Sequence, residues 1–187
     1  MEITKSAIIL DRELSELDNF AVNFCKTISK KTDYVIVSGY VSILLGRARA
    51  SEDIDMIIPK MSAEKWKSVY EHLLKSGYYC LNASDPNGSF ELLNDKIAVR
   101  FASEGVVIPN MEILFALAPV QKMALSSAIK VNIRKETLHI SNLELQIAYK
   151  EKALGSPKDL EDARHLRLML GSNLSTKKLR EFEKMIR

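Results

Sequence analysis

Residues 37–58 read VSGYVSILLGRARASEDIDMII. The β-branched apolar run Tyr34–Val37 ends at a Ser-Gly pair, which is typical of a buried strand followed by a turn. Asp53–Ile58 alternates polar and apolar residues before Pro59 closes the segment, and this pattern favours a second strand. Val41–Leu45, between the two, is long enough to start a short helix. The stretch therefore predicts a strand, a glycine turn and a second strand that carries two acidic residues.

The two aspartates of the second strand predict a metal site. Side chains two residues apart on a strand project to the same face, so Asp53 and Asp55 should lie close together. Their mutual repulsion would raise one pKa unless a cation relieved it. Mg²⁺ prefers carboxylate oxygens together with substrate phosphates, and we therefore interpret both residues as Mg²⁺ ligands, with Mn²⁺ as the alternative ion.

The Ser38-Gly39 pair predicts a place for phosphate groups, because backbone N–H groups in a turn without bulky side chains can hold a triphosphate. A two-metal site that acts on a phosphate group also calls for a third carboxylate on a neighbouring strand, and Glu112 is our candidate. An exposed carboxylate on an edge strand is the alternative interpretation of Glu112. Each feature is common alone, whereas their order along the chain is specific.

In this order the residues resemble the nucleotidyltransferases of the DNA-polymerase-beta superfamily. In that pattern Gly-Gly or Gly-Ser precedes a helix, and Arg-x-Ser/Thr-x-Asp-h-Asp follows, where h is hydrophobic; here the second part is RARASEDID, residues 47–55. The resemblance implies that Asp53 and Asp55 bind metal and that Gly39 lines the triphosphate of an NTP. It also implies that Ser51 and Arg49 sit beside the metal-binding strand. Ser38 stands where the first glycine of the pair is usual.

Two further stretches carry the same resemblance. NMEILFALAPVQKMALSSA, residues 110–128, resembles the strand of minimal nucleotidyltransferases and of antitoxin-paired or abortive-infection enzymes, in which Asp is commoner at the position of Glu112. LELQIAYKEKALGSPKDLEDARHL, residues 143–166, resembles the family's C-terminal helical segment, with a Lys, a small-residue turn and Lys-Asp-x-x-Asp-Ala. The three matches span residues 37–166.

The third stretch adds candidate phosphate-binding lysines. Lys150 and Lys158 can each place an ammonium group against a triphosphate, while Asp159 and Asp162 share a helix face and can orient them. Pro157-Lys158-Asp159 fits an ordinary helix start equally well. Outside this stretch, Arg47 and Arg100 are weaker candidates, because an arginine on a strand is as often paired on the surface.

The rest of the chain predicts an α/β (α+β) fold: a small mixed β-sheet nucleotidyltransferase core flanked by helices, with a helical C-terminal part. Residues 1–118 would form the core, and residues 119–187 would close the cleft. The expected turns and strands outside the opening stretch are Asp85–Gly88 as a turn, Phe90–Leu93, Lys96–Phe101 and Met111–Ala116 as strands, and Lys130–Ile133 with Thr137–Ile140 as a hairpin. The expected helices are Ser15–Lys30, a helix capped by Ser62, Leu143–Leu154, Pro157–Leu170 and Ser175–Met185.

Composition narrows the class of protein. The chain has 187 residues, 47% of them hydrophobic, and no apolar run approaches the roughly 18 residues of a membrane span. We expect a cytoplasmic protein without a membrane partner. Its two cysteines and three histidines show no metal-ligand spacing, and Cys25 falls on an apolar helix face. The net charge of +3 does not by itself indicate nucleic-acid binding.

These features predict a metal-dependent enzyme that moves a nucleoside monophosphate from an NTP to a hydroxyl of a protein or an RNA, releasing pyrophosphate. Two alternatives remain open. One is a weakened member that binds nucleotide without transfer, indicated by Ser38 and Glu112. The other is one half of a toxin–antitoxin pair that acts mainly through a partner protein.

Overall fold

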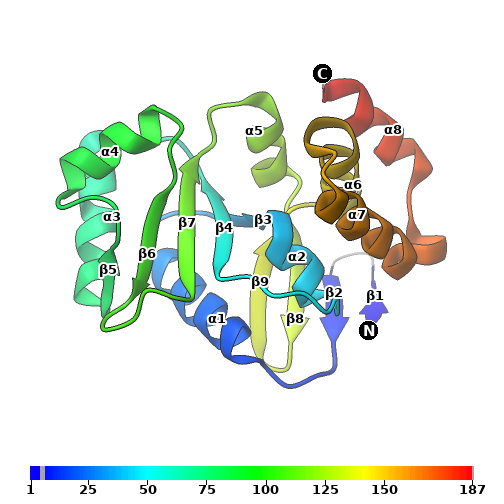
Figure 1. Ribbon diagram of the computed structural model, residues 1–187, viewed down its shortest axis with the longest axis horizontal. Coiled ribbons are helices and arrows are strands. Elements are labelled where there is room, and N and C mark those ends of the chain that lie inside the picture. Colours follow the sequence, from blue (N-terminus) through cyan, green and yellow to red (C-terminus); the bar gives the residue numbers. More distant parts are fainter. Residues whose placement is uncertain (5–6, 187) are drawn as a thin grey trace.

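The computed structural model describes residues 1–4 and 7–186. Within these residues the strands form one mixed sheet in the order β1-β2-β8-β9-β3-β4-β7-β6-β5 (Figure 1). The strands are β1 Glu2–Ile3, β2 Ala7–Leu10, β3 Val35–Val37, β4 Asp53–Ile58, β5 Tyr78–Cys80, β6 Val99–Ser103, β7 Asn110–Phe115, β8 Ile129–Ile133 and β9 Glu136–Ile140.

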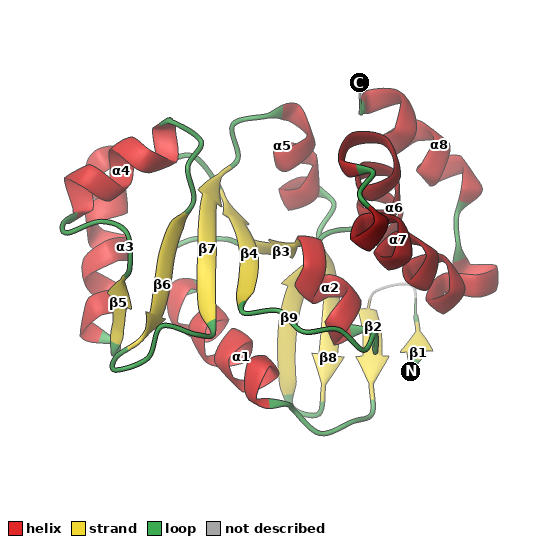
Figure 2. Ribbon diagram, viewed as in Figure 1, coloured by secondary structure: helices red, strands yellow, loops and turns green. Residues whose placement is uncertain are grey.

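Helices flank this sheet on both sides. In Figure 2, α3 and α4 lie beside β5 and β6, while α6, α7 and α8 gather at the opposite end near both termini. The helices are α1 Glu16–Ile28, α2 Ser38–Leu44, α3 Ala63–Lys75, α4 Pro86–Asn94, α5 Pro119–Ser126, α6 Leu143–Tyr149, α7 Pro157–Leu170 and α8 Thr176–Met185, with a π-helical segment at Lys150–Leu154 and a 3₁₀ turn at Gly171–Asn173. The expected mixed sheet flanked by helices is confirmed.

Strand β4 has two unlike faces because its side chains alternate. Ile54, Met56 and Ile58 are fully buried on one face. That face meets an aromatic cluster in which Trp66 of α3 packs edge-on against Phe115 of β7, with ring centroids 5.9 Å apart. The other face carries Asp53, Asp55 and Ile57. The apolar face therefore anchors the strand and leaves its acidic face turned to the far side of the sheet.

The register of the neighbouring strands places further charged groups on the acidic face. Strands β4 and β7 run parallel, with Asp55 opposite Glu112 and Asp53 opposite Asn110. Strand β6 is antiparallel to β7 and sets Arg100 opposite Glu112. Residues opposite one another in adjacent strands share a face, so Asp55, Glu112 and Arg100 stand in one row across three strands.

The segment around residue 90 corrects one expectation. Phe90–Leu93 is not a strand, because it lies inside helix α4. Asp85, expected in a turn, is instead the cap of this helix, and its carboxylate accepts hydrogen bonds from the backbone N–H groups of Asn87 and Gly88. Pro86 occupies the first helical turn, where its missing N–H does no harm. The residues of a turn and of a helix start are the same, and the packing of Phe90 on Phe115 decides in favour of the helix.

The hairpin expected around residue 134 is confirmed as β8–β9, and it joins the sheet between β2 and β3. The helices of the C-terminal region are therefore α5 before this hairpin and α6, α7 and α8 after it. A division of the chain near residue 118 stays a prediction. Among the described residues, no helix has both the length and the apolar character that crossing a membrane requires.

Candidate active site

The site begins where β3 passes into α2. Ser38, the first residue of α2, has a φ of 63°, a left-handed conformation that glycine adopts more easily than serine. Its backbone N–H donates to Gln146 Oε1 at 3.2 Å, which fixes the junction against helix α6. The predicted glycine turn is thus the first turn of a helix. The pattern that the sequence resembles has glycine at this position, and glycine adopts the backbone conformation of Ser38 more easily.

Gly39 leaves room for the Arg49 side chain. A Cβ atom at this position would lie 2.9 Å from Arg49 Nη2 and 3.0 Å from Nη1, so a side chain here would push the guanidinium aside. The guanidinium of Arg49 therefore lies directly against the Gly39 backbone. The same guanidinium is held from behind by Asp162, with Nη1 to Oδ2 at 2.8 Å. Gly39 and Arg49 form one unit of the site.

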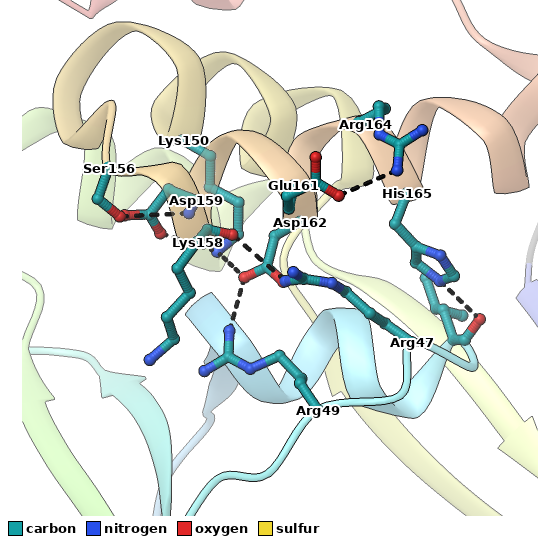
Figure 3. Close-up of polar contacts among 11 residues, drawn as sticks. Arg47, Arg49, Lys150, Ser156, Lys158, Asp159, Glu161, Asp162, Arg164 and His165 are labelled. Atoms are coloured by element: carbon teal, nitrogen blue, oxygen red, sulfur yellow. Dashed lines mark hydrogen bonds and ion pairs between the residues drawn. The ribbon is translucent and has the colours of Figure 1, made fainter.

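Asp162 of α7 is the centre of a cation cluster, which we define as Arg47, Arg49 and Lys150 around this carboxylate (Figure 3). Asp162 is fully buried, and Lys150 Nζ donates to its Oδ2 at 2.8 Å. Burial and the neighbouring Arg47 charge lower the pKa of Arg49, while Asp159, Asp53 and Asp55 oppose that shift. Three cations share the Asp162 carboxylate, and Asp159 also pairs with Lys150, so one positive charge of the cluster has no carboxylate of its own.

The placement of Lys150 depends on an unusual helix. At Lys150 helix α6 passes into the π-helical segment, which ends when Gly155, at a φ of 66°, donates its N–H to the Lys150 carbonyl at 2.9 Å. Lys150 Nζ also lies 3.4 Å from Asp159 Oδ1. Burial lowers its pKa, while the Asp159 charge and hydrogen bond act in the opposite direction. Lys150 is therefore a buried ammonium held between two carboxylates.

Lys158 differs from the other cations. Its side chain is exposed and extends away from Asp162, toward the space in front of Arg49 (Figure 3). Only its backbone carbonyl joins the cluster, as an acceptor from Arg47 at 3.3 Å. Pro157 and the Ser156 cap show that the helix-start interpretation also holds. Lys158 thus lies in the first turn of α7 and also presents an exposed ammonium group to the site.

The acidic face of β4 lies across from these cations. Ser51 Oγ donates to Asp53 Oδ1 at 3.0 Å. Burial raises the pKa of Asp55 to about 6; the Glu112 and Asp53 charges add to this, while a hydrogen bond with Ser38 and the Lys150 charge oppose it. A carboxyl with this pKa lacks sufficient positive charge around it. Asp55 is therefore poised to gain from a cation.

Glu112 is on the expected face but is already engaged. Its Oε1 lies 2.7 Å from Arg100 Nε in an ion pair between β6 and β7. Among residues 1–4 and 7–186, no group of three or more His, Cys, Asp and Glu side chains forms a metal-binding cluster. The structure thus brings Asp53 and Asp55 together, and Glu112 stands beside them with its carboxylate turned to Arg100.

Two adjoining pockets occupy the space between these elements. The polar pocket has a volume of about 230 Å³ and is lined by Ser38, Gly39, Arg49, Ser51, Asp53, Asp55, Ser156, Lys158 and Asp159. The apolar pocket, of about 220 Å³, shares Ser38 and Asp55 with it. All but two of the predicted site residues line the polar pocket; Lys150 lines the apolar one, and Glu112 lines neither.

The donor set of the polar pocket fits a hard divalent cation. Asp53 and Asp55 supply oxygen ligands from one strand face, and burial together with the Glu112 and Asp53 charges raises the pKa of Asp55. Glu112 can join them only by leaving Arg100. The residues present therefore fit a cation held by the two aspartates.

The sequence analysis undervalued one residue of the site, Arg47, and left out another, Gln146. Arg47 was a weak candidate, yet it is one of the three partners of Asp162. Gln146, which fixes Ser38, was not considered, although its position one turn before Lys150 on the same helix was a usable signal. In both cases the contact joins elements more than 100 residues apart, which periodicity does not reveal.

No protein-family model and no curated protein sequence matches the chain. Solved protein structures, in contrast, do match the chain. An antigenic nucleotidyltransferase-like protein from Paracoccidioides brasiliensis shares 18% identity, over 87% of this chain and 83% of that one, with a TM-score of 0.55. ANT(2")-Ia in complex with adenylyl-2"-tobramycin shares 17% identity, over 89% and 97% of the two chains, with a TM-score of 0.52.

The solution structure of ANT(2'')-Ia, described as an antibiotic-resistance factor, gives 16% identity over 88% of this chain and 86% of that chain, with a TM-score of 0.50. Coverage of this extent means that the similarity includes both the sheet and the C-terminal helices. At this identity the likeness defines the fold. The chain has the nucleotidyltransferase fold.

Proposed function

We propose that the protein is a metal-dependent nucleotidyltransferase that moves a nucleoside monophosphate from an NTP to a hydroxyl group of a protein or an RNA, releasing pyrophosphate. One observation carries this proposal. Asp53 and Asp55 stand in the same polar pocket as Arg49 and Lys158, so that carboxylates for a cation and cations for a phosphate line a single space. The complex of ANT(2")-Ia with adenylyl-2"-tobramycin, a nucleotidyl group joined to its acceptor, supports a transfer reaction on this fold.

The cations have separate tasks in this proposal. Arg49 is fixed between Gly39 and Asp162, so it offers a preorganised donor to the triphosphate without reorganising on binding. Lys158, exposed at the start of α7, contacts the outer phosphates. Lys150 stays buried and holds positive charge behind Asp55, which limits the repulsion between that carboxylate and the incoming phosphates.

In the transfer step, the acceptor oxygen attacks the α-phosphorus and forms the new P–O bond. The bond from that phosphorus to the oxygen bridging the β-phosphate breaks, pyrophosphate leaves with the electron pair, and the acceptor proton passes to water. Mg²⁺ or Mn²⁺, when bound, would neutralise charge on the triphosphate and on the attacking oxygen. Asp53 and Asp55 would hold this cation, and Glu112 would join them by exchanging Arg100 for it.

The test removes the two aspartates together. Asp53→Asn with Asp55→Asn should abolish label transfer from α-³²P-NTPs to any acceptor in a cell extract, because both proposed metal ligands lose their charge. The matched control is Glu91→Gln with Glu104→Gln, which removes two exposed carboxylates away from the pocket and should transfer label at the wild-type rate. Undiminished labelling by a folded Asp53→Asn, Asp55→Asn protein would refute the mechanism.

A second candidate is nucleotide binding without transfer. The Arg100–Glu112 pair favours it, because a third carboxylate that is occupied by an arginine does not contribute to the reaction. Calorimetric titration with an NTP and Mg²⁺, beside the label-transfer assay, separates the two. Binding with no transfer to any acceptor would select this candidate, and Arg100→Ala should then raise transfer by freeing Glu112.

A further inference from the structure

The apolar pocket beside the carboxylates has no part in the chemistry derived above. It lies between β4 and β7 on one side and α5 and α6 on the other, and its wall is mainly aliphatic, with Ile57, Leu114, Val120, Ala124, Leu145 and Leu154. Because it shares Ser38 and Asp55 with the polar pocket, one molecule can fill both spaces, with phosphates in one and a flat apolar group in the other.

One wall residue has an unsatisfied hydrogen-bonding group. Ser141 is fully buried and its Oγ has no hydrogen-bond partner, although its backbone N–H donates to the Ile36 carbonyl at 2.8 Å. Within residues 1–4 and 7–186, two other side chains also have such an atom, Ser42 and Asn110, and neither lines this pocket. A buried hydroxyl without a partner is unfavourable, so its position at a pocket wall points to a ligand that completes it.

The two glutamines of the wall have fixed orientations. Gln121 Oε1 accepts from the backbone N–H groups of Leu117 and Ala118, at 3.0 and 2.8 Å. Gln146 Oε1 accepts from the Ser38 N–H. Each carbonyl oxygen is therefore occupied, and the polar group that each side chain keeps for a ligand is its NH₂ donor. Together with the Ser141 hydroxyl, these groups make the wall a set of hydrogen-bond donors, which a ligand with acceptor atoms would satisfy.

We propose that the apolar pocket receives the nucleobase of the NTP, and that Ser141, Gln121 and Gln146 select bases that present carbonyl oxygens. At the same edge of the base, guanine and uracil present a carbonyl oxygen, whereas adenine and cytosine present an amino donor. This inference rests on the proposed function, because it assigns the base to the same nucleotide whose phosphates occupy the polar pocket. It makes Ser141 a specificity-determining residue.

The experiment is calorimetric titration of the full chain with UTP, CTP, GTP, ATP and inorganic tripolyphosphate, with Ca²⁺ in place of Mg²⁺ to prevent turnover. GTP and UTP should bind about tenfold more tightly than ATP and CTP, since one retained hydrogen bond is worth roughly that factor. Ser141→Ala should weaken the binding of GTP and UTP about fivefold while tripolyphosphate binding stays unchanged. Ser42→Ala is the matched control, because it removes an equally buried, unpaired hydroxyl outside the pocket and should change none of the affinities.

Two further variants test where the base binds and which side-chain groups select it. Val120→Phe fills the pocket from α5 and should weaken every NTP more than tenfold without affecting tripolyphosphate. Gln121→Glu keeps an oxygen for the Leu117 and Ala118 N–H groups but replaces the free donor by an acceptor. It should shift the preference toward ATP. Thermal melting of each variant confirms that it is folded.

Three results would overturn the inference. Equal binding of all four NTPs, or Ser141→Ala behaving as Ser42→Ala does, would show that the pocket does not read the base. A folded Val120→Phe protein that binds NTPs normally but no longer transfers label would assign the pocket to the acceptor. In each of these cases the proposed function survives. If neither NTPs nor tripolyphosphate bind at all, the proposed function fails, and this inference fails with it.

Discussion

Two buried carboxylates in this protein have arginine partners, yet they are built differently. Asp18 of α1 accepts from Arg12, from the N–H and hydroxyl of Ser15, and from Tyr40 Oη at 2.7 Å. Burial alone would raise its pKa, but the hydrogen bonds, led by that from Arg12, lower it to about 2. Asp162 instead meets three cations.

The difference separates a structural contact from a binding contact. The Asp18 network pairs one cation with one anion and satisfies the remaining oxygen lone pairs with neutral donors, so it is complete within the fold. The Asp162 cluster instead joins three cations to Asp162 and Asp159, and it faces a pocket that also holds Asp53 and Asp55. Within the cluster, two carboxylates offset two of the three cation charges. Under the proposed function, a phosphate bound in this pocket would take up the remaining charge.

The largest expected effect is on the free energy of unfolding, when the charges of Asp162 and Asp18 are removed in two separate variants. Asp162→Asn should lower the free energy of unfolding by about 3–5 kcal/mol, because Arg47 and Arg49 lose their counter-charge and Lys150 loses one of its two carboxylate partners. Asp18→Asn should have an effect of similar size, since Arg12 is left unpaired. Chemical denaturation of both variants measures these losses.

Added tripolyphosphate then distinguishes the two variants. It should restore much of the stability of Asp162→Asn by neutralising the cation cluster, and it should do nothing specific for Asp18→Asn. Equal responses of the two proteins to tripolyphosphate would contradict the distinction between a complete network and one arranged for an anion.

A smaller effect compares Asp18 with Asp55, whose pKa values move in opposite directions. The folded pKa of Asp55, about 6, lies above the ordinary value of 3.8, so the folded state loses stability as pH rises from about 4 to 6. In EDTA at pH 8, Asp55→Asn should therefore be more stable than wild type by about 2–3 kcal/mol, and the gain should vanish below pH 4. For Asp18, with its lowered pKa, the wild type should keep its advantage over Asp18→Asn above pH 4 and lose it as pH falls toward 2.

Denaturation curves at several pH values test both statements. Mg²⁺ should remove the advantage of Asp55→Asn at pH 8, because the wild-type carboxylate then gains the cation that its surroundings lack. An Asp55→Asn protein that is less stable than wild type in EDTA at pH 8 would show that the Asp55 charge is already compensated.

Much of the fold was predictable because local patterns and packing agree. The apolar run before Ser38 and the alternation in Asp53–Ile58 predict β3 and β4, and both strands are observed. Strands β1, β2 and β5 were not predicted, since each is at most four residues long and carries too little alternation to stand out. The Phe90–Leu93 prediction was wrong because an Asp-Pro helix cap and a turn share the same residues.

The sequence indicated which residues form the site, but it did not indicate how they contact one another. The motif order indicates Asp53, Asp55 and Gly39, and the polar pocket contains all three. The partnership of Glu112 with Arg100 follows from strand register, which depends on how β6, β7 and β4 align in space. No spacing along the chain reveals that register. The function of Glu112 as a third metal ligand stays a prediction.

The smallest effect concerns Gly39, where the cation cluster meets the motif. Gly39→Ala would place a methyl group against the Arg49 guanidinium, which is held by Asp162 and has little freedom to retreat. We expect NTP affinity to fall about tenfold and the free energy of unfolding to fall by about 1 kcal/mol. The control is Gly88→Ala in α4, where the nearest atom to a new Cβ is Asp85 Oδ2 at 3.9 Å. That change should stabilise the protein by roughly 0.5–1 kcal/mol, because alanine favours a helix. Calorimetry and denaturation measure both variants, and normal NTP affinity in Gly39→Ala would mean that Arg49 does not contact the triphosphate.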